Sequence, residues 1–333
     1  MRKISIFVSN THKMKRIIGL VALVLFLNGC DDGELTVETI NFDNVPVAKC
    51  NINNILYKLN GSEILALEIN DDDDYNDAFL NDITITGTPR EVNLSASNRV
   101  VYRSYNGAVS LLNICATISA TTPNVIEEWT ATSGRIEIVT TAVTTTNTTT
   151  NATTITKYNH YIVFKDITFI KPNGIQVYET FVFGNYQTNA TALPFGFDVN
   201  SVQKCSTSNK IYNFSGSESL TLAIAPSLYP NTVGTQTGIV SATNKVTYKL
   251  FTSGLSQSYF CVTPTPSTPI VNQEWNAIDG VSNVSGIIEV ITTTESATSY
   301  RHFIHLKKVT FKKGNSTFNL GDDYLYGSFV TSN

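Results

Sequence analysis

Two Glu-Trp dipeptides are the clearest candidates for chemistry, because each precedes a glycine and a strand-like run that carries a second glutamate. They lie in "EEWTATSGRIEIV" and "QEWNAIDGVSNVSGIIEV", about 150 positions apart. Two carboxylates that flank a glycosidic bond can hydrolyse it, so Glu128 with Glu137, or Glu274 with Glu289, could act on a glycan. Both pairs occur in both copies, however, and a catalytic centre duplicated in two small domains is uncommon. We therefore expect a protein that is not an enzyme.

The tryptophans of these dipeptides allow two interpretations. An exposed indole ring beside a carboxylate could hold a sugar, which makes Trp129, Trp275, Glu128 and Glu274 the candidate ligand-binding residues. Alternatively, a large ring used once per domain at an equivalent point fills the core. The sequence favours the second interpretation.

Other catalytic and metal-binding patterns are missing from the sequence. It contains no Gly-x-Ser-x-Gly elbow, no His-Glu-x-x-His motif and no glycine-rich phosphate loop. His160 and His302 recur in matched segments, each on an apolar stripe that predicts an inward strand face, so we expect hydrogen-bonded structural histidines. We expect no cofactor and no metal.

Two charged segments offer weaker candidate sites. The acidic run "NDDDDYND" (70–77) could supply oxygen ligands to calcium, but the second copy has "APSLYPNT" there, which favours a solvated loop. A basic set near the C-terminus could meet an acidic glycan, although lysines that protect a strand edge are the more ordinary interpretation. The set comprises Arg301, Lys307, Lys308, Lys312 and Lys313.

The N-terminus predicts an export signal. Five basic residues precede the apolar run "IIGLVALVLFL", and no acidic residue occurs before Asp31. The run has 11 residues, whereas a membrane-spanning helix needs roughly 20. We therefore predict a signal peptide over residues 1–29, which starts at Met1 or at Met14.

The segment "LNGC" resembles the lipobox of bacterial lipoproteins. The resemblance implies cleavage before Cys30, a diacylglycerol on its thiol, and attachment to the membrane through that lipid. The following "DDGE" resembles the acidic tract of surface lipoproteins of Bacteroidota, which implies an outer-membrane location with exposure at the cell surface. An aspartate at this position can instead signal retention in the inner membrane of other Gram-negative bacteria. Residues 30–44 are predicted to be a tether.

Charge argues against nucleic acid as a partner. Removal of residues 1–29 takes away five basic residues and no acidic ones, which leaves 18 Lys+Arg against 27 Asp+Glu. A net charge of about -9 opposes binding to phosphates, whose neutralisation dominates nucleic-acid affinity.

An internal repeat predicts two tandem domains. "YKLNGSEILALEI" matches "YNFSGSESLTLAI", "NRVVYR" matches "NKVTYK", and "YNHYIVFKDITF" matches "YRHFIHLKKVTF", always in the same order. We interpret this as a tandem duplication, with a first repeat at residues 45–192 and a second repeat at residues 193–333. The domain family is not recognised.

The cysteines fit the repeat. After lipidation of Cys30, each repeat keeps two cysteines, and thiols exported from the cytoplasm are expected to oxidise. Four cysteines allow three connectivities, but the repeat favours Cys50 with Cys115 and Cys205 with Cys261.

Nearly every segment of the repeats predicts a β-strand. Apolar and polar residues alternate in "SEILALEI" and "SESLTLAI", and no segment keeps a helical period over three turns. About eight strands per repeat predict an all-β protein of two sandwich-like domains. The Thr-rich tract 140–156 is predicted to be a lengthened hairpin whose tip projects into solvent.

These observations favour a lipid-anchored envelope protein with two non-enzymatic β-domains. The abundance of tyrosine and amide side chains favours an extracellular glycan as ligand. The alternative is a structural or adhesive lipoprotein that binds another envelope protein.

Overall fold

The computed structural model describes residues 39–70 and 73–332 of the 333-residue chain. Residues 44–333 form one compact unit, which is distinct from the residues that precede it. The predicted signal peptide, the lipidation site Cys30 and residues 30–38 of the tether lie outside the described residues. Within the described ranges, no helix is long and apolar enough to cross a membrane.

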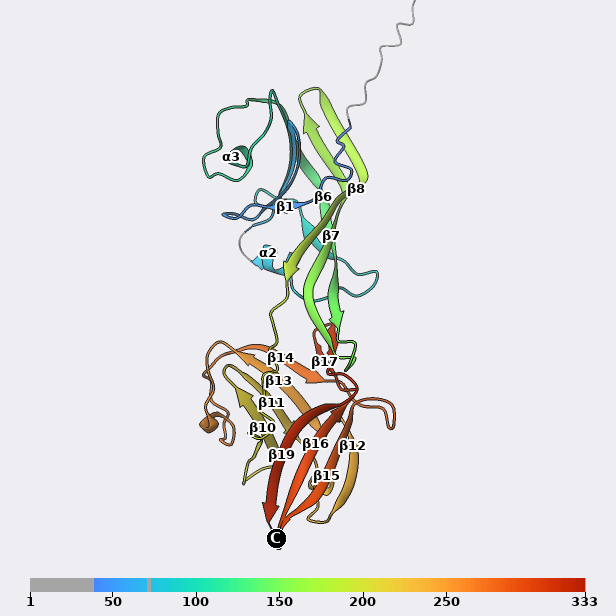
Figure 1. Ribbon diagram of the computed structural model, residues 1–333. Coiled ribbons are helices and arrows are strands. Elements are labelled where there is room, and N and C mark those ends of the chain that lie inside the picture. The colour runs from blue at the N-terminus through green and yellow to red at the C-terminus, as the bar shows by residue number, and fades with distance from the viewer. Residues whose placement is uncertain (1–38, 71–72, 333) are drawn as a thin grey trace, which may run out of the picture. The chain divides into compact units, whose positions relative to one another are not determined.

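The first repeat consists, in its described residues, of eight strands and two short helices (Figure 1). They are β1 (Ala48–Lys49), β2 (Ile55–Asn60), β3 (Glu63–Glu68), α2 (Asp73–Ala78), β4 (Arg90–Asn93), β5 (Arg99–Tyr105), α3 (Leu111–Ile114), β6 (Val125–Thr146), β7 (Thr153–Lys171) and β8 (Gly174–Asn189).

The second repeat consists, over its described part, of eleven strands and two 3-10 turns. They are β9 (Gln203–Lys204), β10 (Lys210–Ser215), β11 (Glu218–Ala223), η1 (Pro226–Leu228), β12 (Gly234–Ile239), β13 (Lys245–Phe251), η2 (Gln257–Tyr259), β14 (Val271–Ala277), β15 (Ile287–Ser296), β16 (Ser299–Lys307), β17 (Thr310–Lys313), β18 (Ser316–Asn319) and β19 (Tyr324–Ser332).

The strands of both repeats pair in the same order. The path β1-β2-β3-β5-β6 of the first repeat is matched by β9-β10-β11-β13-β14 of the second. Likewise β4-β6-β7-β8 is matched by β12-β15-β16-β19. The neighbouring strands are antiparallel, so the predicted all-β class is confirmed. Residues 44–333 form one compact unit, and the boundaries 45–192 and 193–333 stay a prediction.

The strand numbers differ because the first repeat uses three long strands where the second uses pairs. β6, β7 and β8 each continue from one layer into the other, whereas the second repeat divides them into β14 and β15, β16 and β17, and β18 and β19. β6 bends at Gly134, whose φ is 119° and where a Cβ would lie 2.8 Å from the Cα of Ile167. β7 bends at Asp166, with φ 51°, and Lys308 has φ 52° at the matching break between β16 and β17.

The core of the second repeat lies between its two sheets. Leu220 and Leu222 of β11 belong to the same buried cluster as Ile288 and Val290 of β15. The predicted inward face of β7 is also confirmed, because every second residue from Tyr158 to Phe164 is buried. Period-two alternation in the sequence therefore reports the buried face correctly.

In the described part of the chain, each repeat contains one disulfide bond. Cys50 is bonded to Cys115 and Cys205 to Cys261, with Cα–Cα distances of 5.4 Å and 5.5 Å. The connectivity predicted from the repeat is confirmed.

The Thr-rich tract is a hairpin, as predicted, and residues 143–151 at its tip are exposed. The tip also contacts the second repeat, which the sequence did not predict. The backbone N–H of Asp322 donates to the carbonyl oxygen of Thr150 at 2.8 Å, and Asn151 Nδ2 donates to Asp322 Oδ2 at 2.6 Å. The N–H of Asn319 donates to Thr153 Oγ1 at 2.7 Å. The extra length of this hairpin thus reaches the second repeat, which a comparison of strand patterns cannot show.

The acidic run is partly helical instead of a loop. Its second half forms the first turns of α2, and Asp71 and Asp72 lie outside the described residues. Within the part of the chain that the structure describes, no group of three His, Cys, Asp or Glu side chains could hold a metal ion.

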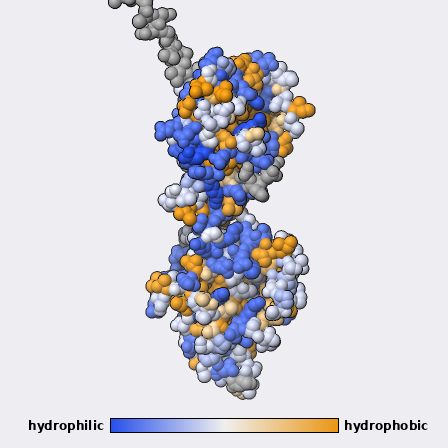
Figure 2. Space-filling model, turned by 180° about the vertical axis from the view of Figure 1, so that it is seen from behind, coloured by the Kyte–Doolittle hydropathy of each residue, from blue (hydrophilic) through white to orange (hydrophobic). Residues whose placement is uncertain are grey.

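The surface mixes polar and apolar residues. On the face drawn in Figure 2, hydrophobic residues form small separate patches among hydrophilic ones. Exposed leucine and isoleucine side chains occur around α3 and on the hairpin of β7 and β8.

Candidate functional site

Trp129, the first candidate ring, is buried against the β5–β6 pair. Its side chain is 2% exposed, and its ring centroid lies 4.9 Å from that of Tyr102. Its Nε1–H donates to Glu127 Oε1 at 2.6 Å, and Lys171 Nζ lies 4.9 Å from the ring centroid.

Trp275 has the same environment in the second repeat. It is 3% exposed, its Nε1–H donates to Gln273 Oε1 at 3.0 Å, and Lys313 Nζ lies 5.6 Å from the ring centroid. Its ring packs edge-on against Phe318 at 5.0 Å. Neither tryptophan is a flat exposed platform, so the interpretation as core residues gains support.

The candidate glutamates are exposed and paired with basic residues on the neighbouring strand. Glu128 Oε2 lies 2.6 Å from Arg103 Nε, and Glu274 Oε2 lies 2.9 Å from Lys249 Nζ. The hydrogen bond from Lys249 lowers the pKa of Glu274. These cross-strand ion pairs occupy equivalent positions in the two repeats, which is typical of sheet stabilisation.

Glu137 and Glu289 also form ion pairs. Glu137 lies 2.8 Å from Arg135, and Glu289 lies 2.7 Å from Lys307. In the basic set, Lys307 is therefore bound to a carboxylate of its own sheet, and Arg301 pairs with Glu295 at 2.7 Å.

The matched histidines are each held between two threonines. His160 Nδ1 lies 2.8 Å from Thr140 Oγ1 and its Nε2 lies 3.0 Å from Thr188 Oγ1. Because Thr188 donates its own proton to Asn81 Oδ1 at 2.5 Å, it accepts from the Nε2–H of His160. Burial lowers the pKa of His160 to about 4, with a further contribution from Arg90, so the ring is neutral at neutral pH.

The second repeat keeps the whole network. His302 lies 2.9 Å from Thr292 and 2.7 Å from Thr331, which donates to Asn231 Oδ1 at 2.6 Å. Burial lowers the pKa of His302 as well. Sequence reasoning identified the histidines but missed Asn81 and Asn231. The two asparagines end the short segments "AFLN" and "LYPN", and this weak similarity was the sequence feature that could have identified them.

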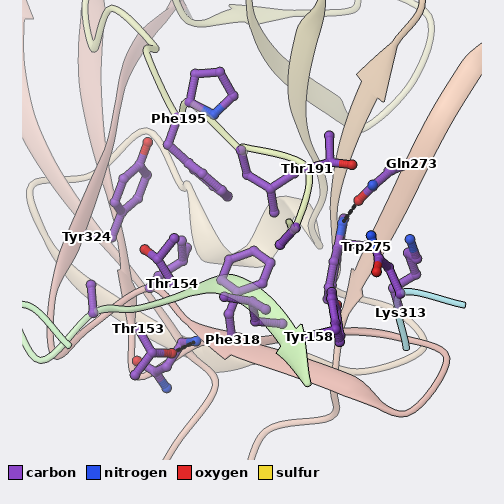
Figure 3. Close-up of a pocket in the computed structure, with 18 residues that line it drawn as sticks. Thr153, Thr154, Tyr158, Thr191, Phe195, Gln273, Trp275, Lys313, Phe318 and Tyr324 are labelled. Carbon is purple, nitrogen blue, oxygen red and sulfur yellow. Dashed lines mark hydrogen bonds between the residues drawn. The ribbon is translucent and has the colours of Figure 1, made fainter. Parts of the chain in front are cut away.

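The described residues contain a cavity of about 220 Å³ where loops of the first repeat meet the second repeat (Figure 3). Of the four candidate ligand-binding residues, Trp275 lines it, and Trp129, Glu128 and Glu274 do not. The lining residues come from Asn81, the start of β7, the segment 190–195, and the strands β14, β17 and β18 with the residues after β18. They are Asn81, Ala152, Thr153, Thr154, Ile155, Tyr158, Ala190, Thr191, Leu193, Pro194, Phe195, Gln273, Trp275, Lys313, Phe318, Asn319, Leu320 and Tyr324.

Aromatic rings form much of the cavity wall. In Figure 3, Phe195 and Tyr324 lie on one side and Trp275 lies on the other, with Phe318 between them. Phe195 is stacked on Tyr248 with centroids 4.4 Å apart, and its ring lies 6.3 Å from that of Tyr324. The wall is therefore a fixed aromatic surface.

A buried glutamate holds Phe195 in this position. Glu218 accepts hydrogen bonds from the backbone N–H groups of Phe195 and Gly196 at 2.9 Å and 2.6 Å. It also accepts one from the Tyr248 hydroxyl at 2.8 Å. Burial, followed by the hydrogen bond to Glu218, raises the pKa of Tyr248. Three hydrogen bonds to one carboxylate therefore hold the backbone at Phe195 and Gly196 beside the cavity.

The polar side chains around the cavity are mainly neutral. Asn81, Thr191, Gln273 and Asn319 supply amide and hydroxyl groups, and among the described residues of the lining Lys313 alone is charged. Burial raises the pKa of Tyr324 to about 12, so its phenol keeps its proton at neutral pH. The cavity thus combines apolar ring surface with neutral donors and acceptors.

The cavity keeps its shape because the two repeats are bound to each other beside it. Asp82 of the first repeat accepts hydrogen bonds from the backbone N–H groups of Asn315 and Ser316 at 2.9 Å and 2.7 Å, and from Ser316 Oγ at 2.6 Å. Tyr158 donates to Ser316 Oγ at 3.3 Å. The turn between β17 and β18 therefore forms a backbone nest for a carboxylate.

Sequence analysis missed both Asp82 and the cavity. Asp82 belongs to no repeated motif. The histidine networks match Asn81 to Asn231, so Thr232 corresponds to Asp82, and not to Asp77 as the alignment of the acidic run with "APSLYPNT" predicted. Thr191 and Phe195 lie on either side of the predicted boundary between the repeats, where the two sequences have no matched motif. The chain matches no known family, no curated protein and no solved structure.

Proposed function

We propose that this chain is a lipid-anchored protein of the cell envelope that binds an extracellular glycan and is not an enzyme. The anchor is Cys30, exposed by removal of residues 1–29, and the location is the outer membrane with exposure at the cell surface. The binding site is the cavity beside Trp275, and no cofactor or nucleic acid takes part.

The observation that carries this proposal is the lining of the cavity. Sugar rings present C–H faces that pack on aromatic side chains, and hydroxyl groups that bind amides and hydroxyls. Phe195 and Tyr324 offer the first kind of surface, the buried Trp275 closes the cavity beside them, and Asn81 and Gln273 offer the second. A volume of about 220 Å³ is below the roughly 300–1,000 Å³ of sites for drug-sized ligands. The cavity therefore suits one sugar ring at the end of a longer glycan.

A pair of threonine variants tests the site. Thr154 and Thr156 are both exposed on β7, and Thr154 lines the cavity while Thr156 does not. A glycan array identifies the ligand, and calorimetry with that glycan compares the variants. We expect Thr154→Trp to fill the cavity and weaken binding at least about tenfold, or 1.4 kcal/mol, and Thr156→Trp to bind normally. Equal binding by the two variants would place the glycan elsewhere.

The anchor is tested separately. Metabolic labelling with a fatty-acid analogue should mark the wild-type chain and not the Cys30→Ala chain. Label that persists in Cys30→Ala would remove the lipoprotein assignment without affecting the cavity.

A second candidate function is binding of another envelope protein, as a structural or adhesive lipoprotein. Ile170 of β7 and Ile175 of β8 are cross-strand neighbours, with exposed fractions of 53% and 65%. Lys312 and Thr317 are the corresponding pair in the second repeat. An Ile170→Lys, Ile175→Thr chain that no longer captures a protein in a pull-down, while it still binds the glycan, would support this function.

A further inference from the structure

One end of the first repeat carries apolar side chains that the fold leaves exposed. This end, called here the disulfide tip, comprises residues 51–54 and 110–122, which the Cys50–Cys115 bond joins. In Figure 1 its helix α3 lies near β1, at the opposite end of the first repeat from β17. Its exposed apolar side chains are Ile52 at 68%, Leu111 at 57%, Leu112 at 65% and Ile118 at 89%.

The tip has a fixed structure, so these side chains do not turn inward. Buried Asn113 donates hydrogen bonds from Nδ2 to the carbonyl oxygens of Ala120 and Thr122 at 3.4 Å and 3.1 Å. Asn53 Nδ2 donates to the carbonyl oxygen of Cys115 at 3.0 Å. Inside the tip, Ile114 and Cys50 already fill a small core with Tyr57, Ile64 and Tyr105. These hydrogen bonds and this small core form a rigid frame. The frame keeps the side chains of Ile52, Leu111, Leu112 and Ile118 in solvent.

The second repeat builds the same frame with other outer residues. "SLLNIC" aligns without a gap to "SQSYFC", and the disulfide Cys205–Cys261 holds the second segment in the equivalent place. At the positions of the four exposed apolar residues, the second repeat has Thr207, Gln257, Ser258 and Pro264. The frame itself therefore does not require leucine and isoleucine on its outer side. Apolar patches on such a frame mark an interaction surface.

The first repeat is also the one that follows the proposed lipid anchor. Asn44 lies only 14 positions after Cys30, a length that spans at most roughly 50 Å when extended. Cys50, which directly precedes the first segment of the disulfide tip, is six positions after Asn44. A lipid on Cys30 thus keeps the first repeat close to the membrane surface, and the second repeat is tied to it only through the first.

We infer that the disulfide tip is a membrane-contact surface, whose leucine and isoleucine side chains enter the lipid interface beside the anchor. The segments 50–57 and 106–126 contain no charged residue, so insertion of the tip desolvates no ionised side chain in these segments. Apolar side chains that enter the interface add to the binding that a lipid chain provides. This inference rests on the lipid anchor of the proposed function, and not on the glycan site.

A pair of tryptophan variants tests the inference. Leu112→Trp and Ser258→Trp place the same fluorophore at matched positions of the two repeats, on a background of two buried tryptophans. The full-length lipidated chains are reconstituted in vesicles of phosphatidylethanolamine and phosphatidylglycerol, with and without brominated acyl chains. We expect the bromines to reduce the added emission of Leu112→Trp and to leave that of Ser258→Trp unchanged.

The other outcomes separate the possible failures. Vesicle-bound chains that show no quenching at either position would overturn the tip contact and leave the anchor intact. Chains that do not float with the vesicles would overturn both the anchor and the tip contact. A dimer in sedimentation experiments that Leu112→Gln dissociates would assign the tip to a second copy of the chain and overturn the lipid contact.

Discussion

Loss of the Asp82 carboxylate should weaken the connection between the two repeats. In Asp82→Ala, the N–H and the hydroxyl of Ser316 lose the acceptor that lies 2.7 Å and 2.6 Å away. Ser316 is buried, and a buried donor left without an acceptor costs about 1–3 kcal/mol. The two Ser316 groups together predict a loss of about 3 kcal/mol, because the exposed Asn315 can be hydrated. For a unit as large as residues 44–333, the melting temperature should fall by roughly 5 °C.

Urea unfolding and differential scanning calorimetry measure this loss. Asp323→Ala is the matched control, since Asp323 pairs only at the surface with His305, at 2.8 Å, and such a pair contributes less than about 1 kcal/mol. If Asp82→Ala unfolds at the same urea concentration as the wild-type chain, the carboxylate does not hold the repeats together and the reasoning about the nest is refuted.

Two further predictions concern the same structure. Gly314→Ala should destabilise the chain more than Gly216→Ala, because both glycines have φ 56° but only at Gly314 would a Cβ collide with Asp82; equal urea midpoints would argue against the close fit of the turn on Asp82. Burial holds the pKa of His160 at about 4, below its unfolded value of roughly 6.5, so the unfolded chain binds more protons and stability falls as the pH drops through this window. Between pH 7 and pH 5 the loss from His160 should be about 2 kcal/mol, with His302 adding to it, and an unfolding midpoint that does not change over this range would contradict the buried neutral histidines.

The repeat allowed much of the fold to be predicted. Alternation along "YNHYIVFK" identified the buried face of β7, and the duplicated cysteines identified both disulfide bonds. These features depend on local pattern and on comparison of the repeats, which a single sequence contains.

The cavity could not be predicted from the sequence pattern, because its residues meet only in the tertiary structure. Asp82, Phe195 and Thr154 come together only where the two repeats meet, and none of them has a matched counterpart that would attract attention. The Thr-rich hairpin was recognised as a hairpin, but its docking on Asp322 follows from the register and bend of β6 and β7. Trp275 was selected as a candidate, yet its burial and its place at the edge of a cavity could be read only from the packing.

The most direct test of the proposed glycan site is a crystal structure of the mature chain with the glycan that binds on the array. The proposal predicts one sugar ring inside the cavity, packed on Phe195 and Tyr324, with hydrogen bonds to the amides of the lining. A sugar bound on another surface, with only ordered water in the cavity, would contradict the central claim.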